Sequence, residues 1–505
     1  MTVLGYVPLG FDGITVSVEV DIRRGIPGTE IVGMAGPPVR EARERVRVAL
    51  KNSGYEYPQD RILVNLSPAD LPKVGAGFDL AIAIAILSAS GQLPGRSPGR
   101  LLAVGELGLD GSLRRVSGVI AAVSAAKARG VRIVVVPEAN RIEASSVFDE
   151  GLIHGRHLRE VVDALSGSGI RTAGRTGAPD SGIHRFWDEQ PEPALPFEKL
   201  SENPRGLRML VIAATGRHHL LLSGPPGTGK TVLARSLPSL LPPLDRSQAL
   251  EVTRIHSQAG VLSPDQHLIR WPPFRAPHPT ASPEGIVGGG AKILPGEISL
   301  AHLGTLFLDE ALEFKKNVLQ GLREPMERRR VYLSRAGRTF WYPADFHLIL
   351  ACNGCPCGNL GKPGSRCSCS YDEVSRYWRR LGGPLLDRIP LRLPFQALEP
   401  GESIENPKGI SEARQTVARG GEIRRRRNLE GLDTSRELSE GCRRVLARGV
   451  EHFGLSRRGE TQTIQVARTI ADIGGRRAIA PEDVLEALAH RSFLEGPEDH
   501  PALIW

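Results

Sequence analysis

Residues 224–231 read GPPGTGKT, and this loop constrains the fold more than any other part of the 505-residue chain. The apolar run 219–223 before the loop predicts a strand, and residues 231–235 after it predict a helix. In such a unit, glycines let the backbone wrap a phosphate while the helix N-terminus directs N–H groups at the anion. We therefore expect a parallel sheet flanked by helices that binds a nucleotide at the end of one strand.

The positions within this phosphate loop are expected to have distinct roles. Lys230 is predicted to reach the β and γ phosphates, and Thr231 is predicted to hold Mg²⁺. ATP and Mg²⁺ are therefore the expected cofactors. The residues expected to bind the nucleotide are Gly224, Pro225, Pro226, Gly227, Thr228, Gly229, Lys230 and Thr231.

Hydrolysis of a bound nucleotide needs further groups, and later segments of the chain supply them. An apolar run ends in Asp309 and Glu310; Asp309 is predicted to hold Mg²⁺ and Glu310 to act as the general base. A second buried run delivers Asn353, a polar residue placed to orient the attacking water. Arg388 has two interpretations: it stabilises charge at a neighbouring subunit's γ-phosphate, or it forms a surface salt bridge.

Length and periodicity predict an α/β multidomain protein. Residues 1–165 alternate strand and helix patterns, as in an α/β domain. Residues 166–195 are rich in Gly, Ser, Pro and Thr, which predicts a linker. Residues 196–398 contain the phosphate loop, and residues 399–505 have helical patterns throughout.

Three segments of the phosphate-loop domain have a predicted local structure. The Gly-rich stretch 277–297 is expected to be a mobile loop, inserted between the phosphate loop and Asp309. A helix is expected over 315–328, and a hairpin with strands at 331–334 and 339–342. The aromatic pair Trp341-Tyr342 in this hairpin is expected either to pack in the core or to stack on bases.

The charge of the chain bears on its partners. The formal net charge of +9 suits a polyanion such as nucleic acid, although surface arginines also serve solvation. The run Arg424–Arg427 is accordingly either a solvated helix face or loop, or a contact to a DNA backbone. No apolar run reaches membrane-spanning length and no secretion signal is evident, so a cytoplasmic protein without a membrane partner is expected.

Four cysteines form a C-x-C…C-x-C pattern within a Gly- and Pro-rich stretch. They are Cys355, Cys357, Cys367 and Cys369. Four thiolates match tetrahedral Zn²⁺, but one intervening residue is fewer than zinc motifs usually have. The alternatives are thus a structural Zn²⁺ site and a loop with incidental reduced thiols. Cys352 and Cys442 are expected to pack in the core.

Several motifs carry a family resemblance. They are PFRAPHPTAS (273–282), GGGAKILPGEISLAHLGTLFLDE (288–310), CNGCPCG (352–358), GPLLDRI (383–389) and the N-terminal stretch 21–58. These motifs resemble the magnesium-chelatase-like AAA+ ATPases of the ComM/YifB family. The resemblance implies an N-terminal domain similar to the proteolytic domain of Lon, then an AAA+ core, then a helical lid. It also implies ATP-dependent homo-hexameric rings, and DNA helicases of branch migration among the ComM-type members.

The same resemblance assigns further roles. It implies that Asn353 is the first sensor, that Arg388 is the arginine finger, and that Arg458 is the lid arginine that contacts ATP, with Arg468 as the fallback. The chain departs from the family on the adenine side. Residues 197–206, FEKLSENPRG, stand where members usually carry D-x-x-x-V-x-G-Q.

The Lon-like domain lacks the residues that peptide hydrolysis needs. A Lon-type enzyme uses a Ser nucleophile activated by a Lys. In the turn 72–77, Ala76 or Gly77 occupies the position of the Ser, and no Lys lies within 118–121. Lys127 falls on a different helical face from Ile120. We therefore expect no peptidase activity, and a scaffold or partner-binding role instead.

Two motor functions and one static function follow as hypotheses. The first is a DNA motor of recombination or natural transformation that acts on forked, branched or single-stranded DNA, with Arg335, Arg338 and Lys292 as DNA contacts. The second is a chelatase-type motor that remodels a protein partner. The third, a non-motor ATP-binding scaffold, is disfavoured by Glu310 and Arg388.

Overall fold

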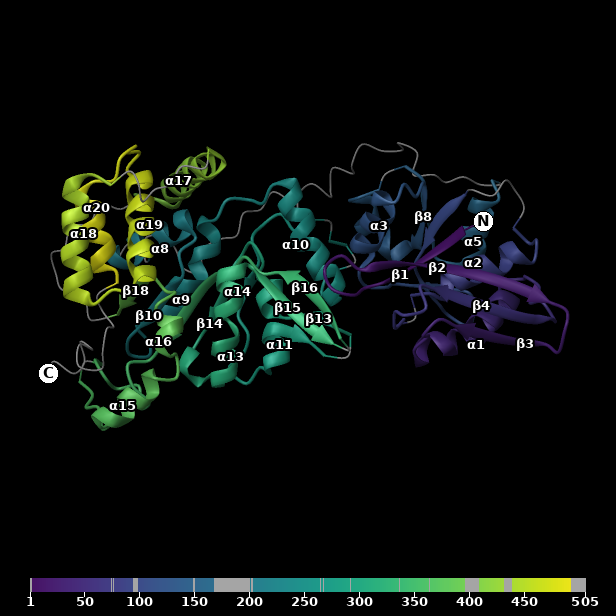
Figure 1. Cartoon of the computed structure of the whole chain (residues 1–505), viewed down its shortest axis with the longest axis horizontal. Coiled ribbons are helices and arrows are strands. Elements are labelled where there is room, and N and C mark those ends of the chain that lie inside the picture. The colour runs from purple at the N-terminus through teal and green to yellow at the C-terminus, as the bar shows by residue number, and fades with distance from the viewer. Residues whose placement is uncertain are drawn as a thin grey trace.

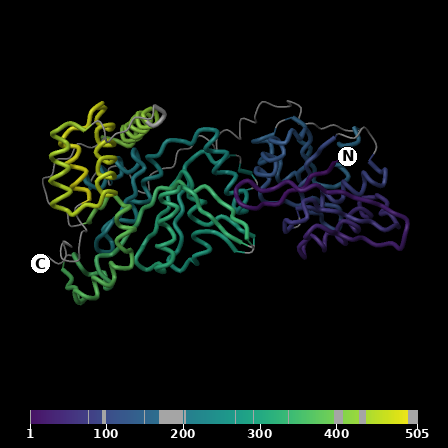
Figure 2. The backbone as a smooth tube through the Cα atoms, viewed as in Figure 1, coloured from purple at the N-terminus to yellow at the C-terminus, as the bar shows by residue number. Residues whose placement is uncertain are grey.

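The computed structural model contains two large β-sheets, of seven and five strands, with separate hydrophobic cores, and a bundle of helices at the far end of the molecule (Figure 1). It describes residues 2–73, 75, 77–93, 99–148, 150–167, 200, 203–263, 265–266, 268–290, 292–335, 337–362, 364–395, 408–430 and 438–491. The predicted linker 166–195 lies almost entirely outside these residues. Figure 2 traces the chain from the first sheet, through the second sheet, to the C-terminal helices. A mixed α/β architecture, as predicted, is confirmed.

The first unit is a seven-stranded mixed sheet between two layers of helices. Its strand order is β3 (Gly28–Val32), β4 (Arg61–Ser67), β2 (Ile14–Arg23), β1 (Thr2–Val7), β5 (Arg100–Ala103), β8 (Ile133–Pro137) and β9 (Leu152–Gly155). The pairs β1–β2 and β2–β4 are antiparallel, and the other pairs are parallel.

Side chains alternate between the two faces of this sheet. In β5, Leu101 and Ala103 belong to the core under one helical layer, whereas Leu102 belongs to the core under the other. The first layer contains α1 (Pro37–Asn52), α2 (Asp79–Ala89) and α5 (Leu158–Leu165), and the second contains α3 (Val119–Ala128) and α4 (Arg141–Ser145). A small hairpin, β6 (Glu106–Leu107) with β7 (Leu113–Arg114), completes the unit.

The second unit is a five-stranded, all-parallel sheet that contains the phosphate loop. Its order is β11 (Phe274–Arg275), β14 (Thr305–Leu308), β17 (His347–Cys352), β10 (Leu220–Ser223) and β18 (Leu391–Pro394). The first strand in sequence, β10, therefore lies inside the sheet, between the last two. Such a doubly wound sheet binds ligands at the carboxyl ends of its strands, where the strand order reverses.

Helices cover both faces of the parallel sheet. They include α8 (Pro204–Gly216), α9 (Lys230–Ser236), α10 (Arg246–Ala259), α15 (Tyr371–Trp378) and α16 (Gly383–Leu386). The predicted helix 315–328 is wrong as a single element, because it divides into α13 (Lys316–Gly321) and α14 (Arg323–Arg328). Pro325 lacks the N–H that would bond to Gly321, so the helix breaks between them.

The stretch 277–297 is folded, which corrects the expectation of a mobile loop. It contains α11 (Pro283–Val287) and a two-stranded hairpin of β12 (Gly288–Gly289) and β13 (Leu294–Pro295), followed by α12 (Glu297–Leu300). Ile286 and Ile293 are buried and hold these elements onto the core. The second hairpin, β15 (Arg330–Arg335) with β16 (Arg338–Pro343), is longer than predicted.

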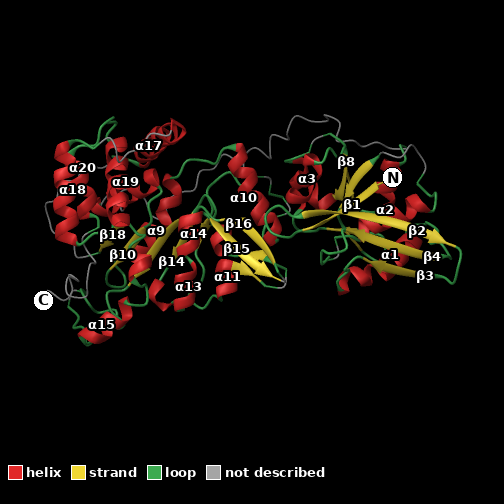
Figure 3. Cartoon of the chain, in the orientation of Figure 1, coloured by secondary structure: helices red, strands yellow, loops and turns green. Residues whose placement is uncertain are grey.

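The C-terminal helices form a bundle against α8. They are α17 (Ile410–Glu430), α18 (Glu440–Phe453), α19 (Arg457–Ile473) and α20 (Pro481–Ala489), and Figure 3 shows this end of the molecule as helical. Ser439 and Ser456 cap α18 and α19 by accepting backbone N–H bonds. The last of them, α20, ends at Ala489, and residues 492–505 lie outside the described residues.

The first unit is attached to the second through α10. Gln258 Nε2 donates to the carbonyl oxygens of Gly10 at 2.9 Å and Phe11 at 3.0 Å. The Gly118 N–H donates to the Ser257 carbonyl at 3.0 Å, and the Phe11 N–H to the Trp341 carbonyl at 2.9 Å. The attachment therefore uses buried hydrogen bonds as well as apolar contact. Within the described ranges, no helix is both long and apolar enough to cross a bilayer.

Candidate nucleotide-binding site

The phosphate loop follows β10 and ends where α9 begins. Gly227 and Gly229 have φ angles of 83° and 93°, a conformation that favours glycine. A Cβ at either position would meet no atom within 4 Å, so the concave side of the loop is open to a ligand. At Gly224, in contrast, a Cβ would lie 2.6 Å from the Phe395 carbonyl oxygen, and the close approach of the chain after β18 requires glycine there.

Lys230 directs its ammonium into the loop. Its Nζ donates to the carbonyl oxygens of Gly224 at 2.7 Å and Pro225 at 2.6 Å, and the residue is 7% exposed. Burial lowers the pKa of Lys230, while nearby Cys352, Asp309 and Glu310 oppose that shift. The structure thus places a cation behind an open anion-binding surface.

A hydroxyl and a carboxylate meet beside the loop. Thr231 Oγ1 donates to Asp309 Oδ2 at 2.9 Å, although the two residues are far apart in sequence. Hydroxyl and carboxylate oxygens are ligands that Mg²⁺ accepts alongside phosphate oxygens. Asn353 directly follows β17, which lies between β14 and β10, and the Gly224 N–H donates to the Cys352 carbonyl at 3.2 Å. Asn353 therefore directly follows the strand end that adjoins the phosphate loop.

Glu310 has a backbone conformation that its residue type rarely adopts. Its φ is 49° and its ψ 47°, and its side chain is exposed. Left-handed conformation at a residue other than glycine costs free energy and is concentrated at functional sites. The turn presents Glu310 to solvent directly after Asp309, whose Oδ1 accepts the Glu310 N–H at 3.1 Å.

Arg388 lies near the amino ends of the parallel strands, opposite the phosphate loop. Leu220 of β10 pairs with Leu391 of β18 in parallel register, so Arg388 precedes the strands and the phosphate loop follows them. Four strand residues rise about 13 Å. Arg388 is 9% exposed, and its Nη2 donates to Glu327 Oε1 at 2.6 Å. Glu327 was missed by sequence reasoning, because nothing in a helical run of charges singles out one carboxylate.

Arg458 lies with Arg388. Both guanidinium groups pair with Glu327, and Arg458 Nη1 is 3.8 Å from Asp387 Oδ2. The candidate lid arginine and the candidate arginine finger therefore lie together near the amino ends of the parallel strands. Arg468, the fallback, is 4% exposed and bonds internally to Asp472 and to the Arg476 and Arg477 carbonyls. That bonding gives Arg468 a structural role.

A cavity of about 390 Å³ opens beside Arg388, near the amino ends of the strands. Its lining includes Arg217, Arg329, Arg388, Arg424, Arg427 and Arg468. Burial lowers the pKa of Arg424 to about 10, with further lowering by the charge of Arg217. Arg424 donates to the Gly216 carbonyl and Arg427 pairs with Asp472, so these two arginines of the run 424–427 face the protein interior. The lining also contains Asp345, which pairs with Arg217 and Arg329.

The three expected DNA contacts lie close together. Lys292 is exposed in the turn between β12 and β13. Arg335 Nη1 donates to the Gly290 carbonyl in the same turn at 3.0 Å, and Arg335 is paired in register with Arg338. Arg338 Nη2 is 2.5 Å from Asp70 Oδ2 of the first unit. We call Lys292, Arg335 and Arg338 the basic hairpin tips.

The aromatic residues of the second hairpin pack internally. The Trp341 and Phe11 ring centroids are 5.3 Å apart. Tyr342 is 1% exposed, and its hydroxyl donates to the Ile293 carbonyl at 2.9 Å. Of the two interpretations of Trp341 and Tyr342, the structure supports core packing.

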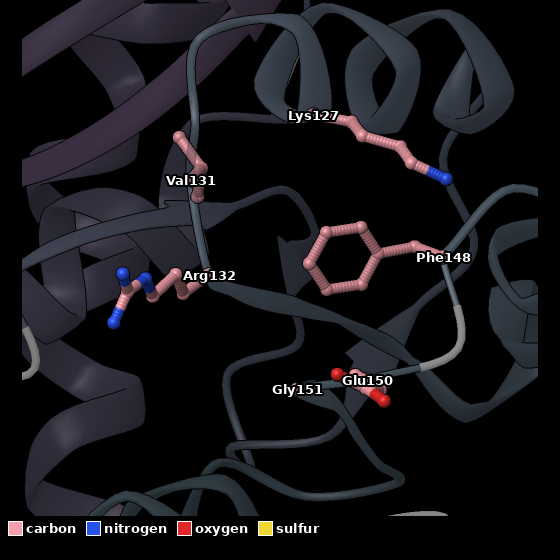
Figure 4. A pocket seen from close by; sticks show the side chains of 6 residues that line it. All are labelled: Lys127, Val131, Arg132, Phe148, Glu150 and Gly151. Atoms are coloured by element: carbon pink, nitrogen blue, oxygen red, sulfur yellow. The ribbon is translucent and has the colours of Figure 1, made fainter.

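The first unit has a cavity of about 640 Å³ but offers no nucleophile there. Its described lining consists of Lys127, Val131, Arg132, Phe148, Glu150 and Gly151 (Figure 4). No hydroxyl or thiol is among these side chains, and Lys127 Nζ donates to the Val147 carbonyl at 3.0 Å. Of the two candidate nucleophile positions, Ala76 lies outside the described residues and Gly77 has no side chain.

The four patterned cysteines form a compact cluster. All four Sγ atoms lie within 4.8 Å of one another. The separations are 3.3 Å for Cys355–Cys357 and 3.6 Å for both Cys357–Cys367 and Cys355–Cys367. Cys352 and Cys442, in contrast, are each buried in a hydrophobic core.

Comparison with known proteins matches three stretches of the chain to models of one protein. Residues 197–403 match "Magnesium chelatase, subunit ChlI", residues 18–140 match "Subunit ChlI of Mg-chelatase", and residues 402–491 match "Magnesium chelatase, subunit ChlI C-terminal".

Full-length relatives extend this match. The chain is 40% identical over 498 residues to the uncharacterized protein YifB of Salmonella typhimurium, covering 96% of each chain. It is 37% identical over 500 residues to the competence protein ComM of Haemophilus influenzae, again covering 96% of each. A local match to the Lon protease of Fervidobacterium nodosum has 29% identity over 154 residues, covering 29% of this chain and 18% of the protease.

Proposed function

This chain belongs to the magnesium-chelatase-like ComM/YifB family, and we propose that it is an ATP-driven motor that remodels DNA as a homo-hexameric ring. The family implies the use of ATP and Mg²⁺. The observation that carries the proposal is the division of catalytic groups between the two ends of the strands of one sheet. Asp309 and Glu310 lie with the phosphate loop at the carboxyl ends, and Arg388 lies near the amino ends.

The groups at the phosphate loop suit ATP hydrolysis. Lys230 and the loop N–H groups bind the phosphates, while Thr231 and Asp309 hold Mg²⁺, which neutralises phosphate charge. Glu310, exposed and next to that site, accepts a proton from the attacking water. Asn353 orients the water. These roles agree with the open surface at Gly227 and Gly229 and with the Thr231–Asp309 contact.

The groups at the amino ends of the strands suit a neighbouring subunit's nucleotide. From that end of the strands, Arg388 cannot reach the phosphate loop of its own chain. A ring that places this end of the strands against the next subunit's phosphate loop brings Arg388 to that subunit's γ-phosphate. Arg458 shares Glu327 with Arg388, so we propose that both arginines act on the neighbouring nucleotide.

The basic hairpin tips support DNA as the partner. They gather positive charge on two adjoining hairpins, and charge of this kind binds a phosphate backbone irrespective of sequence. We propose forked, branched or single-stranded DNA as the substrate, recombination or transformation as the process, and the cytoplasm as its place. The first unit is proposed to be a Lon-like scaffold without peptidase activity.

Strand displacement and branch migration on forked and four-way DNA, with and without ATP, test the proposal. We expect ATP-dependent activity that Lys230→Ala abolishes, together with ATPase stimulation by DNA. An ATPase that no DNA stimulates would contradict the DNA motor and favour the chelatase-type alternative, in which the same site drives remodelling of a protein.

A further inference from the structure

The four-cysteine cluster lies in a loop that has little structure of its own. Residues 353–370 connect β17 to α15, and their described part contains no helix or strand. Yet Cys355 is fully buried, and Trp378 Nε1 donates to the Gly354 carbonyl at 3.0 Å. Ordering a long irregular loop costs backbone entropy at every residue, so such a loop needs a cross-link or extensive packing.

The cluster has the dimensions of a site for a single tetrahedral ion. Thiolates at the Zn–S distance of about 2.3 Å are separated by about 3.8 Å along each tetrahedron edge. The measured separations of 3.3 and 3.6 Å, all within an envelope of 4.8 Å, are close to this value. They exceed a disulfide bond length of about 2.05 Å. In an iron–sulfur cluster the four thiolates are divided among two or more irons, so those on different irons lie further apart.

Backbone groups of the loop are arranged for thiolates. The N–H groups of Asn359 and Ser368 hydrogen-bond to Cys357, and the Leu360 N–H hydrogen-bonds to Cys355. Hydrogen bonds to ligand atoms are typical of the shell around a metal site and fix the ligand orientation. One-residue spacing within each cysteine pair is compatible with this arrangement, because the loop turns between the pairs.

The loop also packs on the phosphate loop. A Cβ at Gly358 would lie 3.4 Å from Pro226 Cγ, and a Cβ at Gly361 would lie 3.6 Å from Pro225 Cγ. The backbones at these glycines are thus adjacent to the two prolines that precede Gly227. The same loop begins at Asn353, which follows the strand bonded to Gly224. The cysteine cluster, the phosphate loop and Asn353 are therefore mechanically connected.

We propose that Cys355, Cys357, Cys367 and Cys369 bind one Zn²⁺ ion, and that this ion braces the loop 353–370 against the phosphate loop and so strengthens ATP binding. The ion is structural: with four thiolate ligands it has no open position for water or substrate. The second half of the proposal rests on the proposed function, since it requires ATP at the phosphate loop; the first half does not.

Metal analysis of the full chain, purified under reducing conditions, tests the site. We expect close to one zinc ion per chain. Replacement of zinc by Co²⁺ should give the strong thiolate-to-metal charge-transfer absorption of a tetrahedral site. Cys357→Ser and Cys369→Ser should lose zinc to a competing chelator, whereas Ser368→Ala, between two ligands, should retain it. Absence of metal from the wild-type chain, or equal retention by all variants, would overturn the site.

Equilibrium binding of a non-hydrolysable ATP analogue, without DNA, tests the brace. Zinc removal should weaken binding by about tenfold, and added zinc should restore it. The Cys357→Ser chain should bind weakly whether or not zinc is added, with circular dichroism confirming that it is folded. An unchanged affinity for the ATP analogue after zinc removal would contradict the proposed effect of zinc on ATP binding and leave the motor function untouched. A zinc-loaded chain that binds no ATP at all would instead contradict the proposed function.

Discussion

At the scale of single residues, the nucleotide site depends on backbone geometry as much as on side-chain identity. Glu310, which directly follows Asp309, has left-handed φ and ψ angles. Such strain persists only where the surroundings enforce it. Here the preceding strand β14 is fully buried and fixes the start of the turn.

Replacing Glu310 tests the general base. Glu310→Gln keeps the size of the side chain but cannot accept a proton, so we expect ATP binding to be retained and turnover to fall by about 10²- to 10⁴-fold. Steady-state ATPase rates and nucleotide binding measure the two effects. Glu313→Gln, three residues along in the same exposed turn, is the matched control. Normal turnover in Glu310→Gln would show that another group takes the proton.

The placement of a residue can be predicted from sequence where its motif implies a fixed local geometry. The phosphate loop and the pair Asp309-Glu310 are examples, because the strand–loop–helix unit places them whatever surrounds it. Sequence reasoning could not place Arg458 beside Arg388, since that proximity arises only when α19 packs near the start of β18. The carboxylate that joins them, Glu327, comes from a third element, α14.

At the scale of elements, the two hairpins form one basic projection. The hydrogen bond from Arg335 to the Gly290 carbonyl joins β15–β16 to the β12–β13 turn that carries Lys292. Asp70 of the first unit neutralises part of this charge by pairing with Arg338. Exposed pairs of this kind contribute little stability, so DNA phosphates can compete for Arg338.

Charge changes on the hairpins should alter the response to DNA more than basal turnover. We expect Arg335→Ala with Arg338→Ala to reduce DNA-stimulated ATPase several-fold and to lower the salt dependence of DNA binding, because two phosphate contacts are lost. Asp70→Asn is the opposite control: it removes the competing carboxylate and should tighten DNA binding. Equal loss of basal and stimulated rates in the double variant would argue against DNA contact by these arginines.

Prediction of the elements failed where tertiary contacts determine the local structure. The glycines of 277–297 suggested a mobile loop, yet Ile286 and Ile293 are buried and hold a helix and a hairpin in place. In 315–328, the apolar pattern continues through the break at Leu322, so periodicity gave no sign of two helices. The strand and the helix predicted on either side of the phosphate loop, in contrast, are confirmed as β10 and α9.

At the scale of the whole molecule, the proposed ring makes each ATP site a joint property of two chains. We expect Glu310→Gln and Arg388→Ala chains to be nearly inactive alone and to regain activity when mixed. In a random equal mixture, about a quarter of the interfaces combine an intact Glu310 with a neighbour's intact Arg388. ATPase rate against mixing ratio measures this recovery. Lack of recovery in mixed rings would place both residues in the same chain's site.

Buried histidines should make the folded molecule sensitive to acid. His256 is 6% exposed, and burial lowers its pKa from 6.5 to about 4. Between these values the unfolded chain binds a proton that the folded chain does not, so stability falls as the pH falls from 6.5 towards 4. At pH 5 the cost for this one residue is about 2 kcal/mol. Burial also lowers the pKa of His347, which adds in the same direction.

The variant His256→Gln tests this contribution. Its amide can still donate to the Leu300 carbonyl, which His256 Nε2 contacts at 3.0 Å, but it does not titrate. We expect the thermal midpoint of the variant to drop less between pH 7 and pH 5 than that of the wild type. An equal drop would mean that His256 is not a source of the acid sensitivity.

The attachment of the first unit has a consequence for movement. Phe11 bonds to the backbone of Trp341 in β16, Arg338 of the same strand pairs with Asp70, and Gln258 of α10 holds Gly10 and Phe11. The hairpin cannot shift without breaking these bonds or carrying the first unit along. Any movement of the hairpin would therefore work against the viscous drag on a whole folded domain, and in the proposed hexameric ring the six first units would form a second tier linked to the first.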